Sequence, residues 1–128
     1  MHQGRIFLID DDPVSLELFS TVLEKAGFEV KSTNQVIGTT GEINQFSPDI
    51  ILVDVMLPAL RGDKMVQILK QSIRSQPVII LISNKSEDEL KNLTKQCGAD
   101  DYIPKINGPA FLLKKVQSHI SAKKKTTT

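Results

Sequence analysis

Hydrophobic residues are concentrated in three continuous runs along the chain, at residues 6–9, 50–53 and 78–82. Uninterrupted aliphatic runs, in contrast to alternating ones, are typical of parallel strands that are buried on both faces of a sheet. Residues 28–31 and 101–103 have weaker strand patterns. The chain is therefore predicted to contain five strands.

Between the strands, apolar residues recur at the spacing of amphipathic helices. The segments with this pattern are residues 13–26, 63–73, 86–98 and a last one from about residue 109. Ser86 and Glu89 have the spacing of a capping box at a helix start, while Gly27 and Gly98 suit helix ends. Residues 35–45 contain two glycines and two threonines. These are weak helix formers, so a short or distorted helix is expected there.

Strands and helices alternate five times, which favours an open α/β sheet with helices on both faces and right-handed crossovers. The 128 residues suit one compact unit, and residues 1–121 are expected to form a single domain. Residues 122–128, AKKKTTT, contain no apolar anchor. They are expected to be a disordered tail.

The composition excludes several classes of protein. Sixteen basic and fifteen acidic residues give a net charge of +1, so no overall field favours nucleic acid or a membrane as a partner. Cys97 is the single cysteine, which excludes an internal disulfide and a multi-cysteine metal site. No apolar run approaches the roughly 20 residues of a membrane span, and too few apolar residues follow Arg5 for a signal peptide. A cytoplasmic protein is expected.

Polar residues follow the ends of the predicted strands. Asp10 and Asp11 follow the first run, Asp54 follows the third strand, Ser83 the fourth and Lys105 the fifth. Because the carboxyl ends of parallel strands meet at one edge of an open sheet, these side chains are expected to lie together.

The chemistry of this set points to phosphoryl transfer. Asp10, Asp11 and Asp54 offer the hard oxygen ligands that Mg²⁺ takes, and a carboxylate can also act as a nucleophile toward phosphorus. Phosphoryl transfer then needs positioning and neutralisation of the phosphoryl oxygens, to which the ammonium of Lys105 and the hydroxyl of Ser83 are suited.

Asp12 has a different expected role from the two acidic residues before it. It directly precedes Pro13, which suits the first position of a helix. Asp12 is therefore predicted to cap this helix with its side chain, where its charge also complements the helix dipole.

In order and spacing, these residues resemble the receiver domain of two-component response regulators, over about residues 4–121. The family has an acidic pair after the first strand, a phospho-accepting Asp after the third, Ser or Thr after the fourth and Lys after the fifth. This pattern is met by Asp10 and Asp11, Asp54, Ser83 and Lys105. Residues 54–62, DVMLPALRG, and residues 98–105, GADDYIPK, are similar to the family's loop after the acceptor and to its run into the lysine.

The resemblance implies a doubly wound, flavodoxin-like (CheY-like) fold, with a five-stranded parallel sheet in the order 2-1-3-4-5. Asp54 would accept a phosphoryl group from a histidine kinase or a phosphotransfer protein. Mg²⁺ would be held by Asp11, Asp54 and the backbone carbonyl of Met56, with Asp10 acting partly through water.

The resemblance also implies a signalling switch that catalyses its own phosphorylation and dephosphorylation. Ser83 and Tyr102 fall at the positions of the family's switch pair, where a hydroxyl moves toward the phosphate and an aromatic ring changes rotamer. The surface of the fourth helix, the fifth strand and the fifth helix would then change its affinity for a downstream effector. The sequence leaves open whether phosphorylation leads to a homodimer. No direct binding to nucleic acid or to a membrane is expected.

Two residues depart from the family's pattern. Asn84 follows the switch hydroxyl, where the family usually has Ala or Gly, and is expected to narrow access to Asp54. Ile106 follows Lys105, where the family usually has a proline in a cis peptide. Because a cis bond before a residue other than proline costs about 2.5–4 kcal/mol, a trans bond is expected.

The main alternative function is that of a pseudo-receiver, which would use the same fold as a protein-interaction module without phosphorylation. A phosphatase with an aspartyl nucleophile would commonly carry a second Asp two residues later, where this chain has Met56. A nucleotide-binding module would carry a phosphate-binding motif, and neither GxxxxGK[ST] nor GxGxxG is present.

Overall fold

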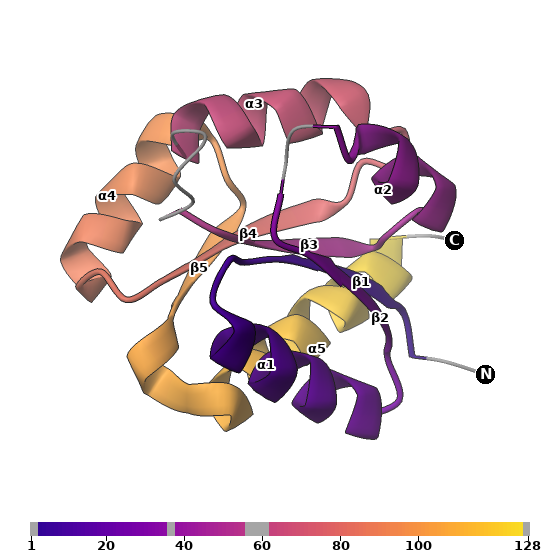
Figure 1. Cartoon of the computed structure of the whole chain (residues 1–128), viewed down its shortest axis with the longest axis horizontal. Coiled ribbons are helices and arrows are strands. Elements are labelled where there is room, and N and C mark those ends of the chain that lie inside the picture. The colour runs from indigo at the N-terminus through magenta and orange to yellow at the C-terminus, as the bar shows by residue number, and fades with distance from the viewer. Residues whose placement is uncertain (1–2, 36–37, 56–61, 127–128) are drawn as a thin grey trace.

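The computed structural model describes the chain except for residues 1–2, 36–37, 56–61 and 127–128, and describes residues 62–63 and 124–126 by their backbone alone. At its centre is a parallel sheet in the order β2-β1-β3-β4-β5 (Figure 1). The strands are β1 Arg5–Ile9, β2 Glu29–Thr33, β3 Ile50–Asp54, β4 Val78–Ser83 and β5 Asp101–Pro104. The doubly wound α/β fold and the strand order expected from the sequence are confirmed.

Helices cover both faces of the sheet (Figure 1). They are α1 Pro13–Lys25, α2 Thr40–Phe46, α3 Gly62–Ser72, α4 Glu87–Cys97 and α5 Gly108–Thr126. α1 and α5 pack on one face, and α2, α3 and α4 pack on the other. A turn of 3-10 helix, η1 Lys105–Asn107, connects β5 to α5.

The central strands are buried on both faces, which explains their continuous apolar runs. In β1, Phe7 and Ile9 belong to the core beneath α2, α3 and α4, whereas Ile6 and Leu8 belong to the core beneath α1 and α5. Alternate residues of a strand point to opposite faces, so a strand with helices on both sides must be apolar throughout. Burial of one such side chain contributes roughly 1.5–3 kcal/mol. The core therefore fixes the register of the strands and the position of their carboxyl ends.

α1 begins as the sequence predicts. The carboxylate of Asp12 accepts a hydrogen bond from the Val14 amide at 3.0 Å and another from the Ser15 hydroxyl at 3.0 Å. Pro13 occupies the first turn, where its missing amide hydrogen leaves no donor unsatisfied. The predicted capping role of Asp12 is confirmed.

Two further helices match their sequence signals. Ser86 caps α4 by accepting a hydrogen bond from the Glu89 amide at 3.3 Å, and the residue that caps the other end of α4, Gly98, has a φ of +80°. That left-handed conformation favours glycine because it has no Cβ. α2 is short, with 7 residues, as expected from its weak helix formers.

Residues 122–126, which belong to the expected disordered tail at residues 122–128, are helical; residues 127–128 lie outside the described residues. α5 continues to Thr126. Alanine and lysine are good helix formers, and lysine charges near a helix C-terminus interact favourably with the helix dipole. In addition, the Lys123 ammonium donates a hydrogen bond to the Asp49 carbonyl at 3.3 Å, which ties this end of α5 to the loop before β3.

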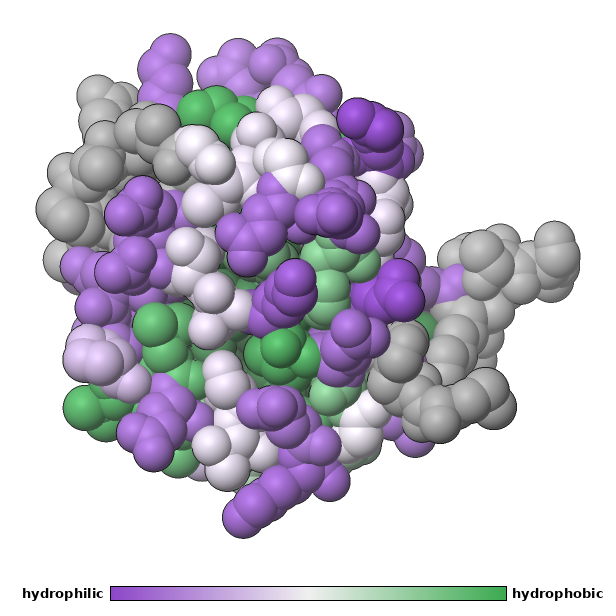
Figure 2. Space-filling view, turned by 45° about the vertical axis from the view of Figure 1, so that its right-hand side comes forward, coloured by the Kyte–Doolittle hydropathy of each residue, from purple (hydrophilic) through white to green (hydrophobic). Residues whose placement is uncertain are grey.

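The surface is mainly hydrophilic on the face shown in Figure 2, where the hydrophobic areas are interrupted by polar side chains. The exposed large apolar side chains of the described residues are Val14, Leu18, Ile106 and Phe111. Within the described part of the chain, no helix is both long enough and apolar enough to cross a membrane.

Candidate functional site

The sheet brings polar residues from distant segments to one edge. Asp10 directly follows β1, Asp54 ends β3, and Lys105 begins the turn after β5. The Lys105 ammonium lies 2.7 Å from Asp10 Oδ2 and 3.0 Å from Asp54 Oδ2. These three side chains therefore meet at the carboxyl edge, as the sequence predicts.

The three charges are almost completely removed from solvent. The Asp10 side chain is fully buried, and those of Asp54 and Lys105 are 5% and 7% exposed. Buried charges are costly unless they are paired, so Lys105 stabilises both carboxylates.

Burial and pairing with opposite charges shift the pKa values of Asp10 and Lys105 in opposite directions. Burial raises the pKa of Asp10, and the neighbouring Asp54 raises it further, although the Lys105 ammonium and the Asp12 amide partly offset this. Burial would lower the pKa of Lys105, but the carboxylates of Asp10 and Asp54 outweigh this and raise it. The site thus has a firmly charged ammonium and a surplus of acidic groups.

The acidic residues are close enough to share a cation. One carboxylate oxygen from each of Asp10, Asp11 and Asp54 lies within 4.8 Å of the other two, and Asp11 is exposed to solvent. Asp10 Oδ1 accepts a hydrogen bond from the Asp12 amide, whereas the buried Oδ2 faces Lys105 without a well-formed hydrogen bond. Three carboxylates close together, one of them exposed to solvent, provide the hard oxygen ligands that Mg²⁺ prefers. Met56, expected to contribute a carbonyl, lies outside the described residues.

The expected switch residues lie on the neighbouring strands. Ser83 is fully buried at the end of β4, and its hydroxyl accepts a hydrogen bond from the Lys85 amide at 3.0 Å. Tyr102 lies on β5, half-buried against the core beneath α2, α3 and α4. Asn84 is exposed. The proposed narrowing of access by Asn84 stays a prediction.

Lys105 reaches the acidic residues without a proline after it. The described residues contain no cis peptide, so the bond to Ile106 is trans, as expected. The chain turns instead through η1, which leaves the Ile106 side chain 90% exposed.

A second charged cluster was not found from the sequence. The Asp101 carboxylate, at the start of β5, contacts the Lys115 ammonium with both oxygens at 3.1 Å and His119 Nε2 at 2.7 Å. His119 lies on the last helix, and the sequence alone does not indicate which residue it contacts. The four-residue spacing of Lys115 and His119 placed them on one face of the helix, but only the packing of α5 shows that this face meets Asp101.

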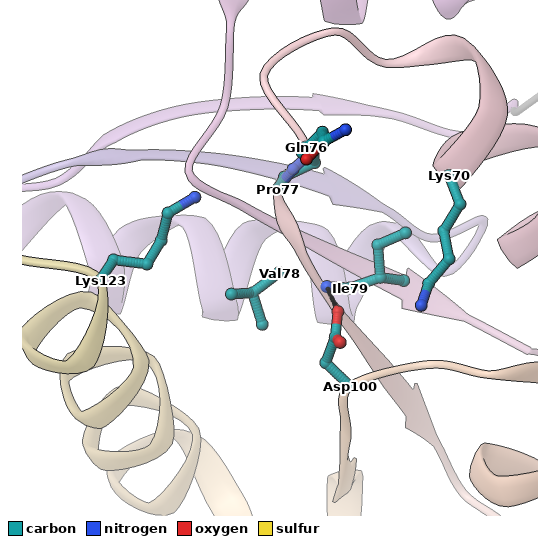
Figure 3. Close-up of a pocket in the computed structure, with 7 residues that line it drawn as sticks. All are labelled: Lys70, Gln76, Pro77, Val78, Ile79, Asp100 and Lys123. Carbon is teal, nitrogen blue, oxygen red and sulfur yellow. Dashed lines mark hydrogen bonds between the residues drawn. The ribbon is translucent and has the colours of Figure 1, made fainter. Parts of the chain in front are cut away.

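A depression of about 430 Å³ lies at the opposite edge of the sheet (Figure 3). It is lined by Lys70, Gln76, Pro77, Val78, Ile79, Asp100 and Lys123. Val78 begins β4, and the Asp100 carboxylate accepts a hydrogen bond from the Ile79 amide at 2.8 Å. This depression lies at the amino end of β4, whereas the acidic site lies at the carboxyl end of the sheet.

Comparisons with known proteins identify the family. Residues 6–117 match the response regulator receiver domain. The phosphate regulon transcriptional regulatory protein PhoB of Escherichia coli is 32% identical over an alignment of 117 residues, which covers 89% of this chain and 50% of that protein. The chain spans about half the length of the first curated relatives that it matches.

Other matches cover whole chains. Protein PilH of Pseudomonas aeruginosa is 29% identical over 90% of this chain and 96% of PilH. A response regulator receiver domain protein (CheY-like) from Methanospirillum hungatei superposes with a TM-score of 0.83 and 25% identity, covering 95% of this chain and 97% of the other. The chain therefore belongs to the response regulator receiver domain family.

Proposed function

We propose that this receiver domain is a phosphorylation-dependent signalling switch, in which Asp54 accepts a phosphoryl group from a histidine kinase or a phosphotransfer protein. The observation that carries the proposal is the contact of one buried ammonium, that of Lys105, with two buried carboxylates. Membership of the receiver family and the nearby third carboxylate of Asp11 support it.

Asp54 acts as the nucleophile in this reaction. A carboxylate oxygen forms a bond to phosphorus while the bond between phosphorus and the donor's imidazole nitrogen breaks, and that electron pair returns to the imidazole. The product is an acyl phosphate, which water later hydrolyses to the carboxylate and inorganic phosphate. The Lys105 ammonium, 3.0 Å from Asp54 Oδ2, compensates negative charge on the transferred group.

Asp10, Asp11 and Asp54 are the proposed ligands of Mg²⁺, together with the carbonyl of Met56. When bound, the ion supplies positive charge that neutralises the phosphoryl oxygens and relieves repulsion between the carboxylates. Within the chain, the Asp12 amide orients Asp10 by donating to its Oδ1 at 3.0 Å. Asp11 is the most accessible of the three carboxylates.

Ser83 and Tyr102 are the proposed switch pair, and the surface of α4, β5 and α5 is the proposed output surface for a downstream effector. The donor must approach the carboxyl edge of the sheet. Ile106 adjoins Lys105 and is 90% exposed, so it offers this donor an apolar contact beside the site. A phosphorylation-dependent homodimer remains compatible with the same output surface.

The proposal is tested by intact mass spectrometry of the purified protein after incubation with Mg²⁺ and acetyl phosphate. The wild type is expected to gain the mass of one phosphoryl group, and Asp54→Asn is expected to gain none. Asp88→Asn, which changes an exposed carboxylate in the first turn of α4, is the matched control and should behave as the wild type.

Two outcomes would contradict the proposal. A wild type that gains no mass, and whose spectra do not respond to beryllofluoride, would favour the pseudo-receiver alternative. An equal gain in Asp54→Asn would place the acceptor elsewhere in the chain.

A further inference from the structure

The described ring of Tyr102 lies beside a positive charge from a different element. The Lys115 ammonium of α5 is 5.7 Å from the centre of the Tyr102 ring and 5.9 Å from that of Phe111. An ammonium within about 6 Å of a ring centre is attracted by the negative face of the aromatic system.

The Asp101 carboxylate fixes this ammonium in place. Each of its oxygens lies 3.1 Å from Lys115 Nζ. The carboxylate is itself held by the Tyr102 amide at 2.8 Å and by His119 Nε2 at 2.7 Å. Burial alone would raise the pKa of Asp101, but these hydrogen bonds lower it, so the group is ionised and only accepts.

The position of β5 at the edge of the sheet makes this arrangement possible. Ile103 belongs to the core beneath α1 and α5, while Tyr102 packs against the core of the opposite face. Because β5 has a neighbour on one side alone, a long side chain from α5 can pass around its free edge. The Lys115 ammonium of α5 thus lies near the ring of a residue that packs against the core of the opposite face.

The contacts are partly shielded from water. The Lys115 side chain is 33% exposed and that of Asp101 is 17% exposed. They line a depression of about 450 Å³ on α5, together with Phe111, Lys114, Ser118 and His119. Attraction between a cation and a ring increases as water is excluded, so this contact is stronger than one at a fully exposed position.

We propose that Lys115 is a positioning residue for the switch: held by Asp101, it keeps the Tyr102 ring in the position seen here and opposes the ring movement that would follow phosphorylation of Asp54. The response to phosphorylation rests on the proposed function, whereas the effect on the resting ring position does not. A ligand or phosphoryl group shifts a two-state equilibrium against whatever stabilises the starting state. Loss of the Lys115 charge should therefore make the switch easier to operate.

The test uses the fact that the chain contains one tyrosine and no tryptophan. Ring signals of ¹³C-labelled tyrosine in NMR spectra report on Tyr102 alone. They are recorded first without phosphoryl analogue and then during titration with beryllofluoride in the presence of Mg²⁺. The variants are Lys115→Met, which removes the charge, and Lys115→Arg, which keeps it. Lys114→Met is the matched control, because Lys114 lines the same depression and is exposed.

Lys115→Met is expected to shift the ring signals of the resting protein. It should also lower the half-saturating beryllofluoride concentration by about two- to fivefold, the range that corresponds to one cation–π contact. Lys115→Arg and Lys114→Met should resemble the wild type in both measurements.

Resting ring signals in Lys115→Met that match those of Lys114→Met would overturn the inference, as would an unchanged or raised half-saturating concentration. A wild type that does not bind beryllofluoride would overturn the proposed function. In that case the resting signals of Lys115→Met still decide whether Lys115 positions the ring.

Discussion

Three consecutive aspartates in this chain have three different surroundings. Asp10 is fully buried beside Lys105, Asp11 is exposed, and Asp12 caps α1. The differences arise at the end of β1, where the chain leaves the core and turns into a helix. Identical side chains at adjacent positions therefore have different chemical uses.

The distinction predicts different effects on Mg²⁺ binding. Asp11→Asn is expected to lower the affinity for Mg²⁺ by about tenfold or more. Mutation of even the residues that hydrogen-bond to metal ligands lowers metal affinity or activity by about 10- to 100-fold. Asp12→Asn should leave the affinity nearly unchanged, because the Asp12 carboxylate is bonded to the Val14 amide and the Ser15 hydroxyl. Calorimetric titration with Mg²⁺ measures both. Equal losses in the two variants would show that the roles are not divided in this way.

Much of the site at the residue scale was predictable from the sequence. Asp54 follows a continuous apolar run and Lys105 follows the weaker strand pattern of residues 101–103, so both were expected at the carboxyl edge of an open sheet. The cap at Asp12 was predictable because it depends on neighbouring residues. The contact of Asp101 with Lys115 and His119 was not, because it depends on how α5 is rotated against β5.

At the scale of elements, Asp101 ties β5 to α5. It accepts hydrogen bonds from the Tyr102 amide, from Lys115 and from His119. Since β5 is an edge strand of 4 residues, it has one neighbouring strand to hold it. The contacts of the Asp101 side chain therefore add to the pairing of β5 with its one neighbouring strand in holding β5 in place.

Asp101→Asn is expected to lower the free energy of unfolding near neutral pH by about 1.5–3 kcal/mol, the range for hydrogen bonds to charged groups. Burial would raise the pKa of Asp101, but its partners hold the pKa below the ordinary 3.8. The unfolded chain therefore binds this proton more readily than the folded one. The stabilisation is complete above 3.8 and is lost as the pH falls through the folded pKa, so the difference between wild type and variant should shrink there.

Urea unfolding at neutral and acidic pH measures this difference. Glu29→Gln is the comparison, because Glu29 forms an ion pair of 3.3 Å with Arg5 in which both side chains are over 40% exposed. Such surface pairs contribute about 0–1 kcal/mol. A loss in Asp101→Asn no larger than that in Glu29→Gln, or a difference that does not change with pH, would contradict the structural role of Asp101.

The expectation of a disordered tail did not take into account how a helix that has already formed is extended. The lack of an apolar anchor in residues 122–128 suggested disorder, yet α5 extends to Thr126. A helix that is already formed is extended at little cost by alanine and lysine, because nucleation has been completed upstream. The Lys123 contact with the Asp49 carbonyl could not be inferred without the position of α5 against the loop before β3.

At the scale of the whole molecule, the doubly wound topology creates the site. β1 and β3 are neighbours in the sheet although α1, β2 and α2 lie between them in the chain. This crossover places Asp10 beside Asp54 at the carboxyl edge, where neither segment alone could form the site. β5, on the far side of β4, carries Tyr102 and leads directly into Lys105, so one strand connects the acidic site to the proposed output surface.

We propose that phosphorylation of this domain forms an acyl phosphate on Asp54. The most direct measurement is peptide mapping after treatment with acetyl phosphate and Mg²⁺, followed by sodium borohydride, which reduces an aspartyl phosphate to homoserine. We expect homoserine at position 54 and at no other aspartate. Modification at Asp10, Asp11 or Asp12, or a peptide map with unmodified Asp54 throughout, would contradict the assignment of Asp54 as the acceptor.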